Sequence, residues 1–544
     1  MTRHAPPRAH PRPHLATLFA ATALLGACGG NDDTATTAAV AAPVPAPAAS
    51  APPALPPAAP TFFDTATASA DGVAQTGYVF NVEATPALKL SIPDLGAIGQ
   101  FWPSQARSVD PAAGTLTYLG AGQGTYVRAG KVYSVNLRKG GTPAEVQVSA
   151  LTTACGLSDQ FEVAADGSDT WFRVDEAGPD GDCATEADNR TAMVRTTGTA
   201  ATAPVFLPSG THMLQRLPDA DMSLRWILAN DTAAAPPKLV LYGTDMTRAG
   251  DVVGGAGAAQ VLPVSGYDTP VPVSYLQAGT ELKRLTWDAA GAALSASLYT
   301  FASSVYAGLG VSDAAATYFK DGTTLLRIVG TAAPSVVTAA LPAATSVENL
   351  RQTPTHLVFK SRPNGSFAGA LMSVAKAGGA PHVLAPSIRI MQWGTHAEQA
   401  VFFVPRLGNE VGDWHRSNVD GSADTTIKTG VQRVGVLNEP IRPMADLNGS
   451  LAGVFYCGVA SAAVGCNAGS LVQYDLATDT HTALGNVAAS SGATRVRVTG
   501  NVVKGHGGSV RLSATDAGGV TRQDVYLFKP GTAGSLTRLT TNLP

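Results

Sequence analysis

The chain has 544 residues, a formal net charge of −3 and only 14 % charged residues. A strongly basic face cannot be built from this composition, so we expect no nucleic-acid partner. The length suffices for a large core. The 57 glycines and 37 prolines predict many turns between short strands, with few long amphipathic helices.

The first residues have the pattern of an export signal. Arg3, Arg8 and Arg12 precede an apolar run from Leu15 to Ala27. A charged start, a short apolar core and small residues at the exit are typical of a secretory signal peptide. A membrane-spanning helix needs about 20 apolar residues, so this shorter run predicts a signal peptide over residues 1–27.

The end of the run, Leu25-Gly26-Ala27-Cys28, resembles the lipobox of bacterial lipoproteins. The resemblance implies cleavage before Cys28 and attachment of a lipid to that cysteine. Gly29 follows, where an aspartate tends to hold such lipoproteins at the inner membrane. The resemblance therefore implies a lipid-anchored protein of the outer membrane, facing the periplasm or the cell surface. The alternative is an ordinary signal peptide followed by an incidental cysteine.

Residues 28–60 are rich in alanine, proline and threonine and contain almost no large apolar side chain. Such a segment cannot bury enough surface to fold, and its prolines keep it extended. We expect a disordered tether here. It would hold the folded part, residues 61–544, away from the membrane.

The folded part repeats one unit, in which a short alternating strand is followed by a turn with Gly, Asp or Pro and by another short apolar strand. Related turns, with Asp-Gly or Asn-Gly type residues between alternating runs, are typical of hairpins and occur at Ala165–Gly167, Trp287–Gly291 and Asp446–Gly449. The predicted strand pairs are Lys131–Leu137 with Val146–Val148, Ala370–Ala375 with His382–Leu384, Asp413–Val419 with Thr425–Ile427, Ser470–Leu476 with Thr482–Leu484, and Asp524–Phe528 with Leu536–Leu539.

Four-stranded sheets repeated every roughly 40 to 60 residues are typical of a β-propeller, where stacking around an axis covers the sheet faces. We therefore predict an all-β fold, a β-propeller of about seven four-stranded blades, with six or eight as options. A multi-domain β-sandwich is the alternative. Residues 61–112 and 185–280 depart from the repeat, and Gly254-Gly255 is expected to form a flexible turn.

These turns, together with strands that end in Gly140-Gly141 and Gly378-Gly379, resemble the repeats of TolB-like and WD40-like propellers of bacterial envelopes. The turn of that family has the form Ser-Pro-Asp-Gly. Its nearest counterparts here are Ala165-Asp166-Gly167 and Arg362-Pro363-Asn364-Gly365. The resemblance implies a propeller in the cell envelope.

The cysteines agree with export. Besides Cys28, the chain has Cys155, Cys183, Cys457 and Cys466, and an even number in an exported chain indicates disulfides. Proximity in sequence favours Cys155–Cys183 and Cys457–Cys466, each stabilising by about 3 kcal/mol in the chain-entropy model. Metal ligation is the alternative, although no C-x-x-C pair or histidine at a matching spacing is present.

Carboxylates gather in residues 175–189, around a glycine that permits a tight bend. Oxygen ligands of this kind suit calcium, and Asp180, Asp182 and Asp188 are the candidate ligands. The order of residues does not match an EF-hand. A solvated hairpin is the alternative interpretation.

The sequence contains no G-x-S-x-G, H-E-x-x-H or P-loop motif. Our first hypothesis is therefore a lipid-anchored binding or assembly module of the cell envelope, which holds a protein or a polysaccharide. One alternative is a propeller enzyme, a lyase or glycosidase acting on envelope or imported polysaccharide. Another is a calcium-dependent surface adhesin that uses residues 175–189.

Overall fold

The computed structural model describes most of the chain between residues 62 and 542, and every regular element in that part is a β-strand. No helix in the described part qualifies as a membrane-spanning segment. The described residues are 62–67, 75–80, 88–92, 101–110, 112–136, 145–147, 151, 153–184, 189–197, 200–257, 261–265, 273–302, 310–313, 315–339, 341, 345–363, 366–388, 393–407, 411–438, 441–443, 450–458, 470–487, 493–503, 507–515 and 520–542.

The N-terminal half of the ring is made of five sheets, in which most strands pair with the next strand in antiparallel order. The first sheet is β1 (Phe62–Thr67), β2 (Gln75–Phe80) and β3 (Leu88–Ile92). The second is β4 (Phe101–Asp110), β5 (Thr115–Arg128), β6 (Lys131–Asn136) and β7 (Glu145–Gln147). The third is β8 (Ala154–Glu162), β9 (Asp169–Glu176), β10 (Arg190–Thr197), β11 (Ala200–Ala201) and β12 (Val205–Phe206). Next come β13 (Thr211–Pro218), β14 (Leu224–Asp231), β15 (Lys238–Tyr242) and β16 (Arg248–Ala256), and then β17 (Val261–Ser265), β18 (Val273–Ala278), β19 (Glu281–Asp288), β20 (Gly291–Leu294) and β21 (Tyr299–Thr300).

The C-terminal half continues in the same way. Two four-stranded sheets are β22 (Val311–Ser312), β23 (Thr317–Asp321), β24 (Thr324–Ile328) and β25 (Ser335–Thr338), and β26 (Thr345–Gln352), β27 (His356–Pro363), β28 (Gly369–Ala375) and β29 (His382–Ile388). The remaining strands are β30 (Trp393–His396), β31 (Gln399–Leu407), β32 (Val411–Asn418), β33 (Asp424–Asn438), β34 (Ile441–Pro443), β35 (Leu451–Gly458), β36 (Ser470–Asp475), β37 (Thr480–Asn486), β38 (Ala493–Val503), β39 (Gly507–Thr515), β40 (Thr521–Phe528) and β41 (Thr537–Arg538).

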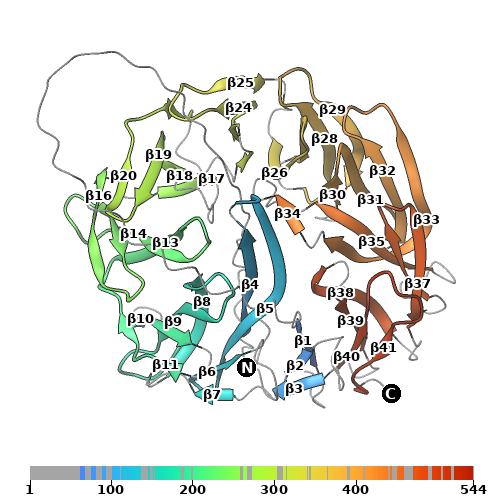
Figure 1. The fold of residues 1–544 in the computed structure, drawn as a ribbon, viewed down its shortest axis with the longest axis horizontal. Coiled ribbons are helices and arrows are strands. Elements are labelled where there is room, and N and C mark those ends of the chain that lie inside the picture. The colour runs from blue at the N-terminus through green and yellow to red at the C-terminus, as the bar shows by residue number, and fades with distance from the viewer. Residues whose placement is uncertain are drawn as a thin grey trace, which may run out of the picture.

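These sheets follow one another around a ring in chain order (Figure 1). The predicted all-β propeller is therefore confirmed, and the sandwich alternative does not describe the fold. The number of seven blades stays a prediction. Parallel contacts of β16 with β20 and of β33 with β38 join neighbouring meanders, so hydrogen-bonded sheets and blades do not correspond one to one.

The predicted strand pairs occur as β6–β7, β28–β29, β32–β33, β36–β37 and β40–β41. Two of the three predicted hairpins lie in described residues. Asp288 accepts hydrogen bonds from the N–H groups of Ala290 and Gly291, and Asp166 accepts one from Ser168. Aspartate thus closes these turns with its own carboxylate, which explains why Asp-x-Gly patterns mark them. The third hairpin, 446–449, lies outside the described residues.

One prediction is wrong. Gly254 and Gly255 belong to β16 and not to a flexible turn. A Cβ atom on Gly255 would lie 3.0 Å from the Cβ of Leu239 and from the carbonyl oxygen of Val252. The glycine is therefore required for the close approach of β16 to β15, which is a known use of glycine inside a strand.

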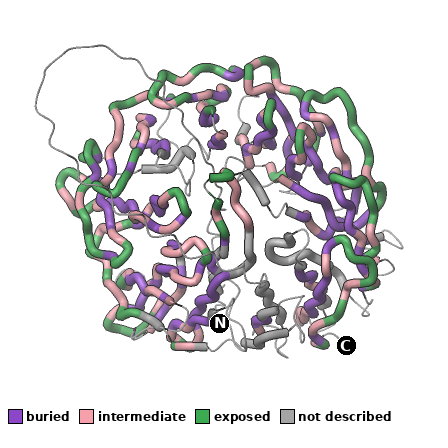
Figure 2. Tube along the Cα trace, in the orientation of Figure 1, coloured by how far each residue is buried: buried purple, intermediate pink, exposed green. Residues whose placement is uncertain are grey.

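The core lies within and between the sheets, while exposed residues follow the outer turns of the ring (Figure 2). Trp171, Trp393 and Trp414 are among the largest fully buried side chains, and Trp287 is 5 % exposed. The tryptophans therefore fill the seams between sheets. At about 25 cal/mol per Å² of buried apolar surface, such residues dominate the stability of each seam.

Side-chain hydrogen bonds to main-chain oxygens also cross the seams. The indole Nε1 of Trp171 donates to the oxygen of Thr244 at 2.9 Å, and that of Trp287 donates to Pro218 at 3.0 Å. Another donor is the Tyr275 hydroxyl, 2.7 Å from the oxygen of Gly330. Each bond satisfies a polar atom that would otherwise be buried without a partner, and it fixes how one sheet lies against the next.

The hairpin of β4 and β5 runs across the middle of the ring in the view of Figure 1. Near its base, the Ser104 hydroxyl donates to the oxygen of Gly167 at 2.7 Å. Close to its tip, Thr115–Thr117 pair with β34. The centre of the propeller therefore contains part of the chain itself, which connects the second sheet to the strand that follows β33.

Candidate functional site

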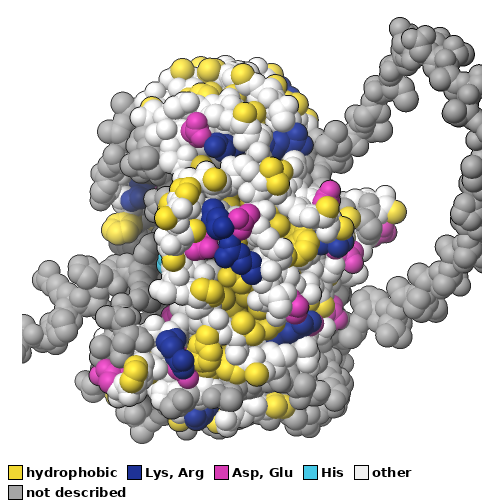
Figure 3. All heavy atoms as spheres, turned by 90° about the vertical axis from the view of Figure 1, so that its left-hand side faces the viewer, with side chains coloured by type: hydrophobic (Ala, Val, Ile, Leu, Met, Phe, Trp, Pro, Cys, Tyr) yellow, Lys and Arg dark blue, Asp and Glu magenta, His cyan; other side chains and the backbone are white. Residues whose placement is uncertain are grey.

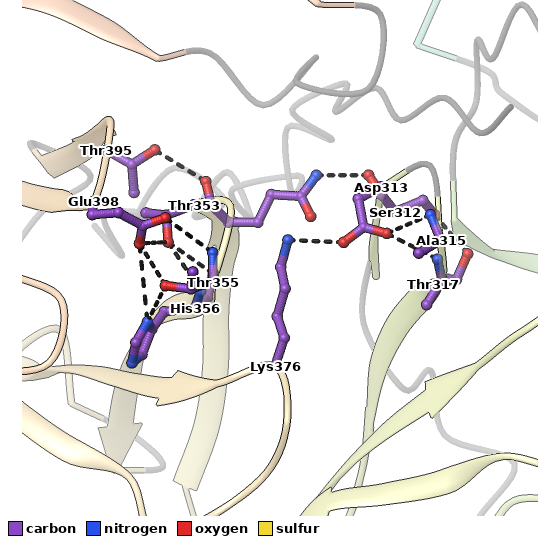
Figure 4. A network of polar contacts seen from close by, with 12 residues as sticks. Ser312, Asp313, Ala315, Thr317, Thr353, Thr355, His356, Lys376, Thr395 and Glu398 are labelled. Carbon is purple, nitrogen blue, oxygen red and sulfur yellow. Dashed lines mark hydrogen bonds and ion pairs between the residues drawn. The ribbon is translucent and has the colours of Figure 1, made fainter.

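Polar side chains join three successive sheets on one side of the ring (Figure 4). They come from the connections β22–β23, β26–β27 and β30–β31, and from the start of the β28–β29 connection. In an antiparallel meander, the first and third connections lie at the same edge of the sheet. We call the side of the ring that carries these connections the network face. The β32–β33 turn of the third sheet lies there too.

Glu398, in the β30–β31 turn, is the acceptor at one end of the network. Its carboxylate accepts hydrogen bonds from the Thr353 hydroxyl at 2.8 Å, from the Thr355 N–H at 3.1 Å and from the Thr355 hydroxyl at 2.7 Å. The carbonyl oxygen of Glu398 also accepts a bond from the N–H of Val419. One residue thereby fixes the turn of the preceding sheet and a second turn of its own sheet.

Asp313 and Lys376 form the ion pair at the other end. Lys376 Nζ lies 2.8 Å from Asp313 Oδ2, and the two side chains are only 13 % and 20 % exposed. Burial raises the pKa of Asp313, but the Lys376 hydrogen bond and charge, with the N–H groups of Ala315 and Ala316, lower it more, so the pKa lies below its ordinary value. Burial and the charge of Asp313 raise the pKa of the adjacent Tyr318 to about 12.

Gln352 connects the two ends. Its amide Nε2 donates to the oxygen of Ser312 at 2.7 Å, and its own carbonyl oxygen accepts a bond from the Thr395 hydroxyl at 3.4 Å. These residues stand at the ends of β22, β26 and β30. The network is therefore continuous over two seams, and the three sheets are held in one register.

The histidines expected to be scattered over the repeats each have local contacts. His356 Nδ1 lies 2.7 Å from the Thr355 hydroxyl, and 4.0 Å from a carboxylate oxygen of Glu398. His396 Nδ1 lies 2.8 Å from the oxygen of Leu451. Hydrogen bonds from Ser422 chiefly lower the pKa of Asp420, and the charge of His356 contributes. His356, Glu398 and Asp420 thus share the network face.

The cysteines expected to pair do so where the structure describes them. Cys155 and Cys183 form a disulfide with a Cα–Cα distance of 5.2 Å, which is the pair that proximity favours. Cys457 is disulfide-bonded and fully buried, while Cys466 lies outside the described residues. Cys28 lies outside them as well.

The candidate calcium ligands are only partly described. Asp180 and Asp182 are exposed, and each carboxylate accepts an N–H bond from the residue two positions later. Asp188 lies outside the described residues. Among those that are described, no three His, Cys, Asp or Glu side chains are grouped so that they could hold a metal ion. Calcium binding by this loop stays a prediction.

On the side of the ring formed by β10, β14, β16 and β20, basic and acidic side chains lie next to one another (Figure 3). Arg248 pairs with Asp231 and Asp251, and Lys238 pairs with Asp251. This side therefore carries mixed charge, with single apolar side chains such as Val253, which is 71 % exposed.

No protein-family model matches the sequence, and the search of curated proteins found no match. Similar solved structures include TolB from Acinetobacter baumannii (11 % identity, 68 % of this chain and 81 % of that chain, TM-score 0.23), the β-propeller domain of the Trilobed protease from Pyrococcus furiosus (8 %, 61 % and 98 %, 0.28) and apo AztD from Citrobacter koseri (11 %, 68 % and 94 %, 0.30). Likenesses this weak carry no argument of their own. The strand topology defines the class: the protein is a β-propeller.

Proposed function

We propose that this propeller is a binding or assembly module of the cell envelope, and that the network face holds its partner, a protein or a cell-surface polysaccharide. The observation that carries the proposal is the network of Asp313, Gln352, Lys376 and Glu398, which ties the turns of three sheets together. Turns fixed in this way lose little conformational entropy on binding, which favours affinity.

The proposal includes the anchor. Cleavage after residue 27, lipid at Cys28 and an extended tether over 28–60 would place residues 61–544 at the outer membrane. Mass spectrometry of the mature N-terminus tests this part separately. A lipidated Cys28 is the expected result, and an unmodified N-terminal residue would contradict the anchor while leaving the binding proposal standing.

The binding proposal is tested by crosslinked pull-down from envelope fractions, with the tethered protein as bait. Ser422→Arg places a bulky cation in an exposed turn of the network face. Thr323→Arg makes a matched change in the exposed β23–β24 turn, a second connection and so at the opposite edge of its sheet. We expect a stoichiometric partner with the wild type and with Thr323→Arg, and its loss with Ser422→Arg.

Equal capture by both variants would contradict the assignment of the network face. If a folded bait captures no protein, a polysaccharide library distinguishes the remaining outcomes. Retention without turnover supports glycan binding, while turnover would replace the module with a propeller enzyme. Loss of binding on chelation would instead point to the calcium-dependent adhesin.

A further inference from the structure

A second group of titratable side chains lies where the sheet of β35–β37 packs against the sheet of β30–β33. Tyr456 on β35 and Tyr474 on β36 are 4 % and 2 % exposed. Their rings belong to the apolar cluster that also contains Val401 and Trp414 of the neighbouring sheet. The two tyrosines are thus part of the seam, and the surroundings of their hydroxyl groups affect how the two sheets hold together.

His481, on the exposed strand β37, is the partner of the first tyrosine. The Tyr456 hydroxyl and His481 Nδ1 are 2.7 Å apart, and the imidazole packs against Tyr474 with ring centroids 4.8 Å apart. Burial raises the pKa of Tyr456 to about 12, so the phenol keeps its proton at neutral pH and donates it. Nδ1 must then offer its lone pair, which requires a neutral imidazole with its proton on Nε2.

Charged groups from the other sheet face this pair. Lys428 on β33 acts on His481 electrostatically, as does Asp479 in the β36–β37 turn. The Tyr474 hydroxyl donates to the carboxylate of Asp479, and Arg416 on β32 lies 3.6 Å from the same carboxylate across the seam. Partial burial and the charge of Lys428 lower the pKa of His481, and Asp479 opposes them. Neutral His481 is therefore the form that fits this seam.

We propose that His481 is a pH-sensitive latch: neutral, it accepts the Tyr456 hydroxyl and holds the edge of the β35–β37 sheet, and protonated, it releases that edge. Protonation occupies Nδ1, so the buried Tyr456 hydroxyl loses its acceptor. It also adds a cation close to Lys428 and Arg416, with Asp479 as the carboxylate between them. Both effects favour opening of this seam in acid.

The sign of the pH dependence follows from linkage. The pKa of His481 is lower in the closed seam than in an open one, so the open form binds the proton more tightly. The stabilisation is complete above the ordinary histidine pKa of about 6.5, and is lost as the pH falls toward the lowered value. The opening equilibrium rises by up to about tenfold for each pH unit that separates the two pKa values.

His481→Asn tests the latch, because the asparagine Oδ1 can accept the Tyr456 hydroxyl without titrating. Hydrogen exchange of residues 470–487, corrected for intrinsic rates, is measured from about pH 8 to about pH 5, the range in which histidine titrates. We expect acid to increase exchange in the wild type and not in His481→Asn. His382→Asn, a matched change at an exposed histidine of β29, should behave as the wild type.

Lys428→Met gives an independent test should His481→Asn fail to fold. Removing this charge raises the pKa of His481, so the acid-induced opening should begin at a higher pH. The proposal is overturned if His481→Asn keeps the acid sensitivity of the wild type, if Lys428→Met leaves the transition unmoved, or if NMR titration finds the pKa of His481 at or above its ordinary value.

Discussion

Neighbouring seams of this propeller use different polar chemistry. The seam between the β22–β25 and β26–β29 sheets carries an Asp313–Lys376 ion pair, and the next one carries a saturated Glu398 carboxylate. The seam between the β30–β33 and β35–β37 sheets carries a hydroxyl–imidazole bond instead. Carboxylates and amines keep their charges over the physiological range, whereas histidine does not. Similar apolar seams can therefore differ in their response to pH.

The largest expected effect comes from breaking the ion pair. Lys376→Ala leaves the mostly buried Asp313 carboxylate without its cation, and we expect a loss of about 3 kcal/mol in the free energy of unfolding, measured by urea denaturation. Lys238→Ala is the control, because its pair with Asp251 is more exposed and should contribute less than about 1 kcal/mol. Equal losses would show that Asp313 does not depend on Lys376.

Glu398→Ala should have a smaller effect. The side chain is 42 % exposed, so water can replace part of what the carboxylate supplies to Thr353 and Thr355. We expect a loss of about 1–2 kcal/mol in the free energy of unfolding, with faster hydrogen exchange in the 353–356 turn. Glu281→Ala, at a similarly exposed carboxylate paired with Lys283, should change stability less. Unchanged exchange at 353–356 would contradict the role of Glu398.

Tyr456→Phe removes the hydroxyl and keeps the ring in the seam. We expect a loss of about 1 kcal/mol at neutral pH, and a smaller loss in acid because the wild type has already released this bond. Tyr275→Phe removes a comparable hydroxyl, which donates to a main-chain oxygen that does not titrate. Its cost should be the same at both pH values. A pH-independent cost for Tyr456→Phe would contradict the latch.

The fold was predictable where its determinants are local. The β28–β29 and β36–β37 pairs show alternation followed by a turn, a pattern that a short window of sequence contains in full. Residues 61–112 and 185–280 depart from the repeat and yet contain strands of the ring. Pairing of β13 with β14 shifts between Met213 and Gln215, and β16 contains two glycines, so the alternation is interrupted there.

The polar networks were not predictable in the same way. Asp313 and Lys376 are 63 positions apart, and Thr355 and Glu398 are 43 apart. These pairs meet only because consecutive sheets place equivalent turns side by side. Asp313 does carry a local signal, since Asp followed by small residues forms the same carboxylate-closed turn as at Asp288. That signal indicates a turn, but nothing in it specifies a lysine partner.

The smallest expected effect separates the two kinds of seam by pH. The pKa of Asp313 is lowered in the folded chain, so its contribution is present above the ordinary carboxyl value of about 3.9, and is lost as the pH falls through the lowered value. In the His481→Asn background, the free energy contributed by the Asp313–Lys376 pair should therefore stay constant down to about pH 5, then decline.

A double-mutant cycle of Asp313→Asn and Lys376→Met in that background measures this contribution at each pH, and leaves the other carboxylates as a common baseline. A coupling energy that already falls between about pH 7 and pH 5 would mean that the ion-pair seam also depends on a histidine. The proposed difference between the seams would then be lost.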